Sequence, residues 1–450
     1  MAAVEHVYRY VRPSTVGILD GLPDVRFATS GGFDANPHVF EGLLGHAEQM
    51  AVALLMVSRV ARTRFYVPPG MLTAILRAAD PVVTSAADRL RFESFSACCG
   101  VHVRLDVLPG ALGGRALTNG TTNVDVNPPM RQALAGIGGD DALHLTIGED
   151  VTVTTAAAGS VTETKVPLPR RWLAGFAEVQ VAGATMVPVL EGGAAEARRF
   201  IHGLPRTSAG AAAPLWAVAT GRGLRLSGRP SAQSVCLAGP DRLRVLEPLL
   251  RFATSLRAYA PAVATPGRPA PSIWELNLHD ARVSVTLSPS SARGFSGEGG
   301  VLRDLADPFT PDDAALISAL LAFEPRIDIA TIALDADLPP ERVLRALGRL
   351  GAAGRVGFDA HDGAYFHREL PYDPELLRSM HPRLVDAHAL VAAGAVTSAG
   401  PEVHVRSGDG DYVVRSTAAG TRCTCPWYGR HQDSRGPCKH VLAAELVARG

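Results

Sequence analysis

Three cysteines and a histidine near the end of the chain have the types and spacing of a metal site. Cys423 and Cys425 are separated by one residue, and after twelve further residues come Cys438 and His440. Thiolate and imidazole groups are the ligands that a tetrahedral structural zinc site uses. Alternate side chains of an extended segment share a face, so the first two cysteines can reach one ion together. The four residues therefore predict a closed, structural Zn²⁺ site.

The second pair of ligands lies where a short helix is expected to begin. Cys438 follows a proline and precedes the apolar segment VLAAELV, residues 441–447. The exposed N–H groups and the positive end of the helix dipole favour a thiolate at such a position. The alternative is a set of three buried free thiols beside a surface histidine. We favour the metal site because four potential ligands fall within eighteen residues.

This segment resembles the SWIM zinc finger, whose pattern is CxC, a variable spacer and CxH leading into a helix. The resemblance runs through STAAGTRCTCPWYGRHQDSRGPCKHVLAAEL and the strand-like EVHVRSGDGDYVVRS before it. Three other stretches, TNVDVNPP, KVPLPRRWLAGF and RGFSGEGG, look like parts of bacterial SWIM-finger proteins of similar length. The resemblance implies a Zn²⁺ ion held by Cys423, Cys425, Cys438 and His440, and it brings no catalytic residue. It also implies a role in either DNA binding or protein–protein contacts.

Length and composition indicate several folded domains in a cytoplasmic protein. The chain has 450 residues, 47% of them hydrophobic, which is enough for two to four domains with cores of their own. The net charge is zero, so no overall field attracts a polyanion. Apolar runs such as AVALLMV are far shorter than a membrane span, and no signal-like leader opens the sequence. Cys98, Cys99 and Cys236 are expected as buried, reduced thiols, with a redox role for the adjacent pair as the alternative.

The pattern along the chain predicts an α+β multidomain protein. Its N-terminal body is of mixed α/β type, and it is interpreted as a duplicated, clamp-like arrangement with a shared sheet. Helices are expected at 46–65 and 70–82, and a further helix over DRLRVLEPLLRFATSLRAY, residues 241–259, opens the second copy. The expected segments are a body at 1–287 with units of about 1–205 and 206–287, a Ser/Gly-rich linker at 288–310, a winged-helix-like unit at 311–370, a connecting helix at 371–400 and the zinc finger at 401–450. The composition of 288–300 also suits a loop that closes on a partner.

The winged-helix-like unit is predicted from three helical patterns and a hairpin. PDDAALISALLAF, IDIATIALDADL and RVLRALGRLGAAG have helical spacing, and RVGFDAHDGAYFHREL places two strands around a DG turn. Arg342, Arg345 and Arg349 lie on the outer face of the third helix, as in a DNA recognition helix. Residues 311–450 nevertheless hold 15 Arg and Lys against 18 Asp and Glu, whereas duplex-binding proteins usually present a basic face. A protein-docking role is therefore at least as well supported.

The loop between the two ligand pairs mixes aromatic and basic residues. Trp427 and Tyr428 stand beside the cationic side chains of Arg430, Arg435 and Lys439. Cations interleaved with aromatics hold single-stranded nucleic acid through phosphate attraction and base stacking. The same aromatics also cover metal sites or anchor protein interfaces, where both types are enriched. The sequence leaves these alternatives open.

The sequence offers no convincing catalytic constellation. Four ligands indicate a closed zinc site, whereas a catalytic zinc keeps one position open. Asn123, Asp125 and Asn127 alternate but lack the other ligands of a calcium loop. We therefore expect a non-catalytic zinc protein, not an enzyme, that docks a protein partner and does not enter membranes. The alternatives are a DNA-binding factor that uses winged helix and finger together, and an enzyme body regulated by its zinc tail.

Overall fold

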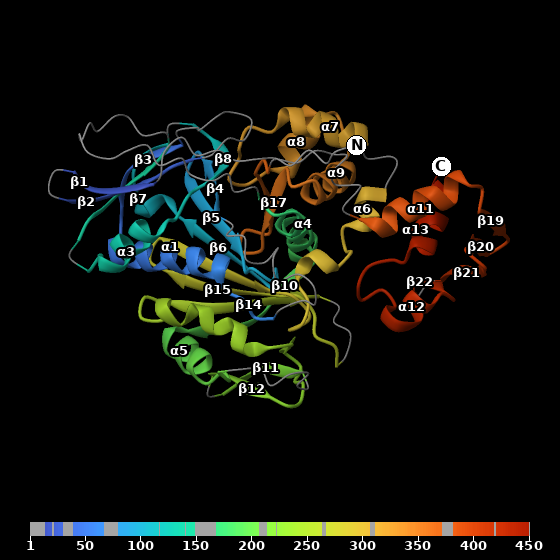
Figure 1. The fold of residues 1–450 in the computed structure, drawn as a ribbon, viewed down its shortest axis with the longest axis horizontal. Helices are drawn as coiled ribbons and strands as arrows, with labels where there is room; N and C mark the ends of the chain where they lie inside the picture. The colour runs from blue at the N-terminus through green and yellow to red at the C-terminus, as the bar shows by residue number, and fades with distance from the viewer. Residues whose placement is uncertain are drawn as a thin grey trace.

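The computed structural model of the chain describes most of its residues (Figure 1). The expected helix at 70–82 falls almost entirely outside the described residues, and so do residues 307–310 of the expected linker and residues 371–380 of the expected connecting segment. The described residues are 14–19, 22–29, 39–66, 80–116, 118–139, 141–148, 168–206, 214–221, 223–262, 267–306, 311–370, 381–417 and 420–449. None of the helices among them is long and apolar enough to cross a membrane.

An eight-stranded antiparallel sheet forms the centre of the body (Figure 1). Four of its strands come from residues 82–123 and four from residues 186–287, and the two groups join where β16 pairs with β6. The strands, in spatial order, are β10 (Met186–Gly193), β14 (Ser255–Pro261), β15 (Ser272–Leu278), β16 (Ala281–Leu287), β6 (Val101–Val107), β5 (Arg89–Phe95), β4 (Val82–Ala86) and β8 (Gly120–Asn123).

One face of this sheet is apolar because side chains alternate along each strand. Val103 and Leu105 of β6 and Val283 of β16 lie on that face and belong to the largest hydrophobic core. It packs against α1 (Ala47–Arg62), the helix expected at 46–65, and against the 3-10 helix η2 (Pro240–Leu249). The opposite face carries charged residues, yet it is also buried.

The helix expected over residues 241–259 is shorter than predicted. η2 ends at Leu249, and residues 255–261 form strand β14 between β10 and β15. Pro248 has no backbone N–H to continue a helix. Beyond it, Leu256 and Ala258 alternate with more exposed residues and bury themselves in the sheet, and this pairing overrides the helical spacing of the apolar residues.

Two smaller sheets extend the body. A five-stranded sheet has the order β1-β2-β9-β3-β7, and a three-stranded sheet has the order β12-β11-β13. The strands of the first are β1 (Thr15–Leu19), β2 (Leu22–Phe27), β9 (Leu143–Ile147), β3 (Phe40–Leu44) and β7 (Leu112–Ala116); those of the second are β12 (Gly223–Ser227), β11 (Leu215–Thr220) and β13 (Ser234–Leu237). Three helices accompany them, namely α3 (Pro128–Gly136), α4 (Arg170–Ala184) and α5 (Ala194–His202), and the 3-10 turn η1 (Pro109–Ala111) precedes β7.

Residues 288–306 of the expected linker pack into the body. Phe295 of the 3-10 turn η3 (Phe295–Gly297) is 1% exposed, and its N–H bonds the carbonyl oxygen of Cys99 at 2.8 Å. A Cβ at Gly294 would lie 2.4 Å from the carbonyl oxygen of Cys98, so only glycine permits this approach. The short helix α6 (Leu302–Ala306) follows. Glycine here therefore serves close packing, where the composition suggested a flexible chain.

Three helices and a hairpin follow in the predicted order. They are α7 (Pro311–Leu320), α8 (Ile329–Asp335), α9 (Pro340–Ala352), β17 (Val356–Asp359) and β18 (Ala364–His367). The inner face of α9 contributes Val343, Leu347 and Leu350 to a core shared with α7 and α8. The identification of this unit as a winged helix remains a prediction.

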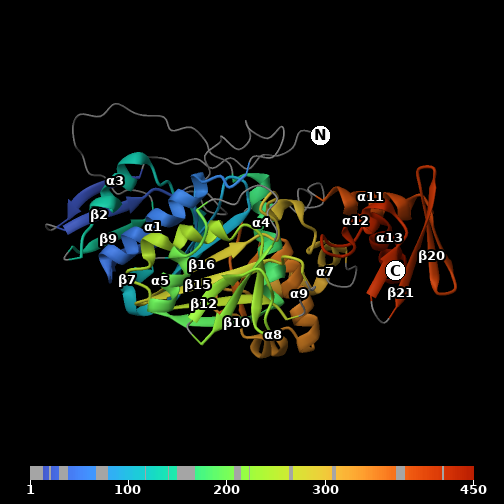
Figure 2. The ribbon, with the colours of Figure 1, turned by 90° about the horizontal axis from the view of Figure 1, so that it is seen from below.

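The C-terminal unit, residues 382–449, lies at one end of the molecule (Figure 2). Helix α11 (Pro382–Ala392) leads into a four-stranded antiparallel sheet, and two helices follow. The strands are β19 (Val396–Ala399), β20 (Glu402–Ser407), β21 (Gly410–Thr417) and β22 (Gly420–Cys423), and the helices are α12 (Pro426–His431) and α13 (Lys439–Arg449).

Candidate metal centre

Four donor atoms converge at the junction of the C-terminal sheet and its last two helices. Cys423 ends β22, where it pairs with Val414 of β21. Cys425 has extended backbone and caps α12, and Cys438 directly precedes α13. His440 lies in the first turn of α13. The extended CxC segment and the helix start thus have the local structures that the sequence predicted.

The geometry of the four side chains fits a single ion. Their donor atoms all lie within 4.8 Å of one another, and Sγ of Cys423 is 3.8 Å from Nδ1 of His440. Zn–S bonds of about 2.3 Å in a tetrahedron place sulfur atoms roughly 3.8 Å apart. All four residues are buried, His440 with 5% and Cys438 with 1% exposure. Three thiols and an imidazole form a donor set suited to zinc and leave no position for a substrate.

Backbone N–H groups support two of the thiolates. The N–H of Tyr428 bonds Sγ of Cys425 at 3.4 Å, and the N–H of Val441 bonds Sγ of Cys438 at 3.5 Å. Both donors lie in the first turns of helices, where N–H groups otherwise lack partners. A hydrogen bond from Cys423 lowers the pKa of Cys438, while the same contact raises the pKa of Cys423.

The ring of His440 stacks on a neighbouring aromatic side chain. Its ring lies 4.4 Å from that of Tyr412 at an angle of 23°. Nε2 is buried and has no hydrogen-bond partner among the described residues, whereas Nδ1 faces the thiols. An imidazole that offers Nδ1 to an ion carries its proton on Nε2. The ring is thus oriented for metal binding through Nδ1.

Comparison with known proteins identifies this segment. Residues 412–448 match the family model of the SWIM zinc finger. The chain therefore carries a C-terminal SWIM zinc finger. One similar solved structure is the crystal structure of Proliferating Cellular Nuclear Antigen from Entamoeba histolytica, at 10% identity and a TM-score of 0.34, over 56% of this chain and 99% of that one. That likeness is too weak to support the clamp-like expectation, which stays a prediction. No curated protein matches the chain.

The SWIM finger is packed against the rest of the molecule through α11. Arg383 donates to the carbonyl oxygens of Arg435 at 2.7 Å and of Glu298 at 3.0 Å. Arg303 of α6 lies 3.0 Å from the carboxylate of Asp433. Apolar residues of α6, α11 and α13 form one further cluster, namely Leu302, Ala306, Leu384, Ala387, Leu442 and Ala443. The finger is therefore joined to the body by both packing and polar contacts.

The aromatic and basic residues predicted for binding divide into engaged and exposed groups. The guanidinium groups of Arg383 and Arg435 lie 4.6 and 5.0 Å from the centre of the Trp427 ring. Both arginines therefore contact Trp427. Lys439 pairs with Asp386 of α11 at 3.4 Å. Tyr428 is half-buried beside the ligands. Arg430 is exposed and contacts only the carbonyl oxygen of Pro426 among the described residues, at 3.3 Å.

The arginines of α9 are likewise only partly available. Arg342 makes two hydrogen bonds to the carboxylate of Asp313 on α7, at 2.8 and 2.6 Å. Arg349 contacts the carbonyl oxygens of Asp304 and Leu305. Arg345 is exposed and makes no ion pair with a described residue. The structure thus does not bring these three arginines together into one free surface.

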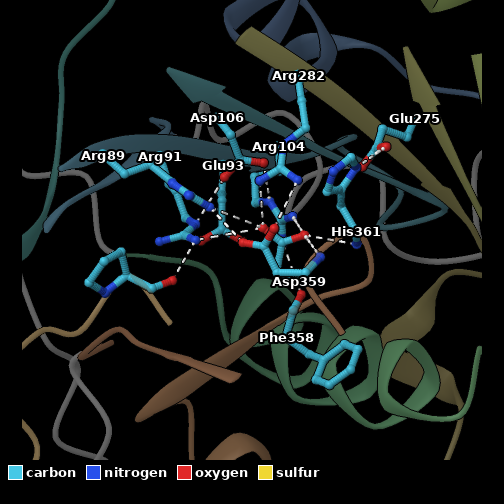
Figure 3. A network of polar contacts seen from close by, with 12 residues as sticks. Arg89, Arg91, Glu93, Arg104, Asp106, Glu275, Arg282, Phe358, Asp359 and His361 are labelled. Atoms are coloured by element: carbon cyan, nitrogen blue, oxygen red, sulfur yellow. Dashed lines mark hydrogen bonds and ion pairs between the residues drawn. The ribbon is translucent and has the colours of Figure 1, made fainter. Parts of the chain in front are cut away.

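The β17–β18 hairpin, the expected wing, is docked on the charged face of the central sheet. Asp359 of the hairpin is 1% exposed. Its carboxylate lies 3.0 Å from both Arg104 of β6 and Arg282 of β16, 3.6 Å from Arg91 and 3.7 Å from Arg89 of β5 (Figure 3). A wing in this position cannot approach a DNA groove without leaving the sheet.

Electrostatics explain how so many charges tolerate burial. Burial alone would raise the pKa of Asp359, but the guanidiniums of Arg104, Arg282 and Arg91 outweigh it and hold the pKa well below its usual range. Asp106 bridges Arg91 and Arg104 at 2.9 Å each. Each arginine therefore faces at least one carboxylate, as a buried charge requires.

A second buried pair extends this network at the end of the hairpin. Arg368 is fully buried and makes two hydrogen bonds to Glu93 of β5, at 2.9 and 2.8 Å. The ring of Phe366 lies under the guanidinium of Arg91, at 3.9 Å. Sequence reasoning missed this site. Its signal was the alternation of arginines and carboxylates with apolar residues in RLRFESF and VHVRLDV, which is also the pattern of a solvent-exposed face.

Two buried carboxyl groups lie where α4 and the 288–306 segment meet the finger. Burial raises the pKa of Glu178 to about 8, and its carboxylate accepts the N–H of Gly300 at 2.9 Å. Burial also raises the pKa of Glu298, whose carboxylate is 4.0 Å from Arg435 of the finger. One oxygen of each carboxyl group has no hydrogen-bond partner among the described residues.

Proposed function

We propose that the chain is a non-catalytic zinc-binding protein whose SWIM finger docks a protein partner. The carrying observation is the convergence of four buried donor atoms within 4.8 Å. Cys423, Cys425, Cys438 and His440 hold Zn²⁺, which supplies the cross-link between the sheet and the two helices. The apolar core of the finger is too small to replace it, because it includes three of the ligands themselves.

Charge and exposure favour a protein partner. The residues most suited to grip a nucleic acid, Trp427 and Arg342, are already occupied by contacts within the chain. Apolar side chains are exposed on the neighbouring helices α8 and α9, with Leu334 at 83% and Leu344 at 45% exposure. Such leucines match the apolar centres of protein interfaces.

A DNA-binding factor is the second candidate. It is favoured by Arg345, Arg422 and Arg430, which are exposed and make no ion pair with a described residue. Electrostatic contacts of this kind would weaken steeply with salt. The two candidates therefore differ in a measurable way.

The test compares the full-length protein with Cys425→Ser and with a matched control. Cys236→Ser removes a thiol from β13, far from the finger in the sequence. Elemental analysis should find one zinc per chain in the wild type and in Cys236→Ser, and none in Cys425→Ser. A partner protein identified in pull-downs should remain bound after nuclease treatment. It should be lost from the pull-down only with the Cys425→Ser variant. Retention that disappears with nuclease would instead favour the DNA-binding factor, and absence of stoichiometric metal would overturn both.

A further inference from the structure

An open pocket of about 430 Å³ lies between α1 and α3, far in the sequence from the SWIM finger. Arginines are the largest class of side chain around it. The lining residues are Leu55, Arg59, Arg62, Thr63, Arg131, Gln132 and Ala135. The volume is within the range of about 300–1,000 Å³ that is typical of small-molecule sites.

The three arginines of this pocket lack carboxylate partners among the described residues. Arg62 of α1 donates to the carbonyl oxygen of Val126 at 3.4 Å, and Arg131 of α3 donates to the same oxygen. Arg59 is exposed one turn before Arg62. Two guanidiniums thus converge on one neutral acceptor. An acceptor of this kind satisfies hydrogen bonds but does not neutralise positive charge.

Two other surface arginines of the body pair with carboxylates. Arg251 pairs with Glu48 at 2.6 Å, and Arg257 pairs with Glu191 at 3.0 Å. Arg59 and Arg62 stand three residues apart in the last turn of α1, where the helix dipole favours cations but the two guanidiniums repel each other. An anion between them would remove this repulsion.

The acidic residues that act on Arg131, namely Asp125 and Asp80, are not among the lining residues of the pocket. Asp125 is 8% exposed, and its carboxylate accepts hydrogen bonds from the side chain of Asn127 and from the N–H of Ser14. Burial raises the pKa of Asp125. Burial and the charge of Arg62 lower the pKa of Arg131, while the charges of Asp125 and Asp80 act in the opposite direction. The lining itself holds three guanidiniums and no carboxylate.

We propose that this pocket binds the phosphate group of a small phosphorylated molecule. The planar guanidiniums of Arg62 and Arg131 would grip the phosphate oxygens in forked hydrogen bonds, and Arg59 would add charge from the rim. Leu55 and Ala135 provide an apolar wall for the rest of the ligand. The ligand would relieve the repulsion between the two converging arginines.

The test is calorimetric titration of the full-length protein with inorganic pyrophosphate at low salt. We expect saturable binding, weakened at least tenfold in Arg62→Ala and in Arg131→Ala. The variants Arg62→Lys and Arg131→Lys keep the charge but lose the fork, so their affinity should be intermediate. Arg229→Ala, which removes an exposed arginine far from the pocket, is the matched control and should bind as the wild type does.

Several outcomes would overturn the proposal. They are absence of binding, equal binding by all variants, and equal affinity for sulfate, which would show unspecific anion attraction. An oligonucleotide that binds through the same arginines while pyrophosphate does not would assign the surface to a nucleic-acid backbone. The far-ultraviolet circular dichroism and thermal midpoint of each variant must equal those of the wild type. The Lys variants keep the test valid if an Ala variant fails to fold.

Discussion

The β17–β18 hairpin and the SWIM finger both attach small β-elements to the molecule, but they use opposite arrangements of charge. Around Asp359, the guanidiniums of four arginines face a carboxylate that the protein itself supplies. In the finger, Cys423, Cys425 and Cys438 are donors of the same kind, and no described cationic side chain pairs with them. The first assembly pairs charges that the chain itself supplies, whereas the second gathers donor atoms that suit a cation.

This difference predicts how each region unfolds when one of its interactions is removed. Removing one partner from a buried ion-pair network leaves uncompensated charge and destabilises the whole interface. Removing the ion from a small zinc site eliminates most of the free energy that folds it. Loss of the hairpin network should therefore weaken the body as a unit, while loss of zinc should unfold the finger alone.

Loss of one of the predicted zinc ligands should have the largest effect on folding. Cys425→Ser should abolish zinc binding and unfold residues 402–449, because the ion contributes on the order of 10 kcal/mol to such a site. Limited proteolysis should then cleave the finger and spare the body. Cys236→Ser should leave the pattern unchanged. A proteolysis pattern of Cys425→Ser identical to the wild type would contradict the comparison.

A substitution at the centre of the hairpin network should cause the second-largest loss of stability. Asp359→Asn leaves Arg104 and Arg282 without their shared carboxylate and should lower the free energy of unfolding by about 3–5 kcal/mol. Chemical denaturation of the body measures this loss. Asp362→Asn is the comparison variant and should cost less, because Asp362 is 18% exposed at its side chain and shares Arg89 and Arg282 with Asp359. Equal losses in the two variants would show that the network has no centre.

The buried carboxyl of Glu178 should make stability depend on pH. Its pKa is about 8 in the folded protein, above the value of an unfolded glutamate, so the folded state retains a proton that the unfolded state has lost. The stability present below about pH 4 should therefore fall as the pH rises to about 8, by at most about 4 kcal/mol. Thermal unfolding across this range should show the decline, and Glu178→Gln should flatten it. Glu41→Gln, at an exposed site on β3, should leave it unaltered.

The exposed arginines of α9 should have the smallest effect on stability. Arg342→Ala breaks a surface pair with Asp313 and should leave the thermal midpoint unchanged within error, as should Arg345→Ala. Retention on a DNA column at increasing salt distinguishes their roles. No change in either variant supports the protein-docking proposal. Reduced, salt-sensitive retention in Arg345→Ala would assign α9 to nucleic acid.

Local spacing made the metal centre and the helix–hairpin order readable from the sequence. The ligands fall within eighteen residues, and the DG turn of the hairpin joins strands four residues long. The helix predicted at residues 241–259 was wrong at its end, because residues 255–261 pair with β10 and β15 as strand β14. The packing of residues 288–306 was missed for the same reason. In both cases, contacts distant in sequence outweighed local composition.

The sequence by itself predicted the four residues whose donor atoms converge, because donor types, spacing and a helix start are all local features. It also determined which residues of β5 and β6 share a face, since alternation in a strand has a period of two. Only the tertiary structure decided that the charged face would be covered. Asp359 and Arg368 cover this face. They lie more than 250 positions along the sequence from β5 and β6, whose charged side chains they pair with. No local pattern shows which element will bring the compensating charge.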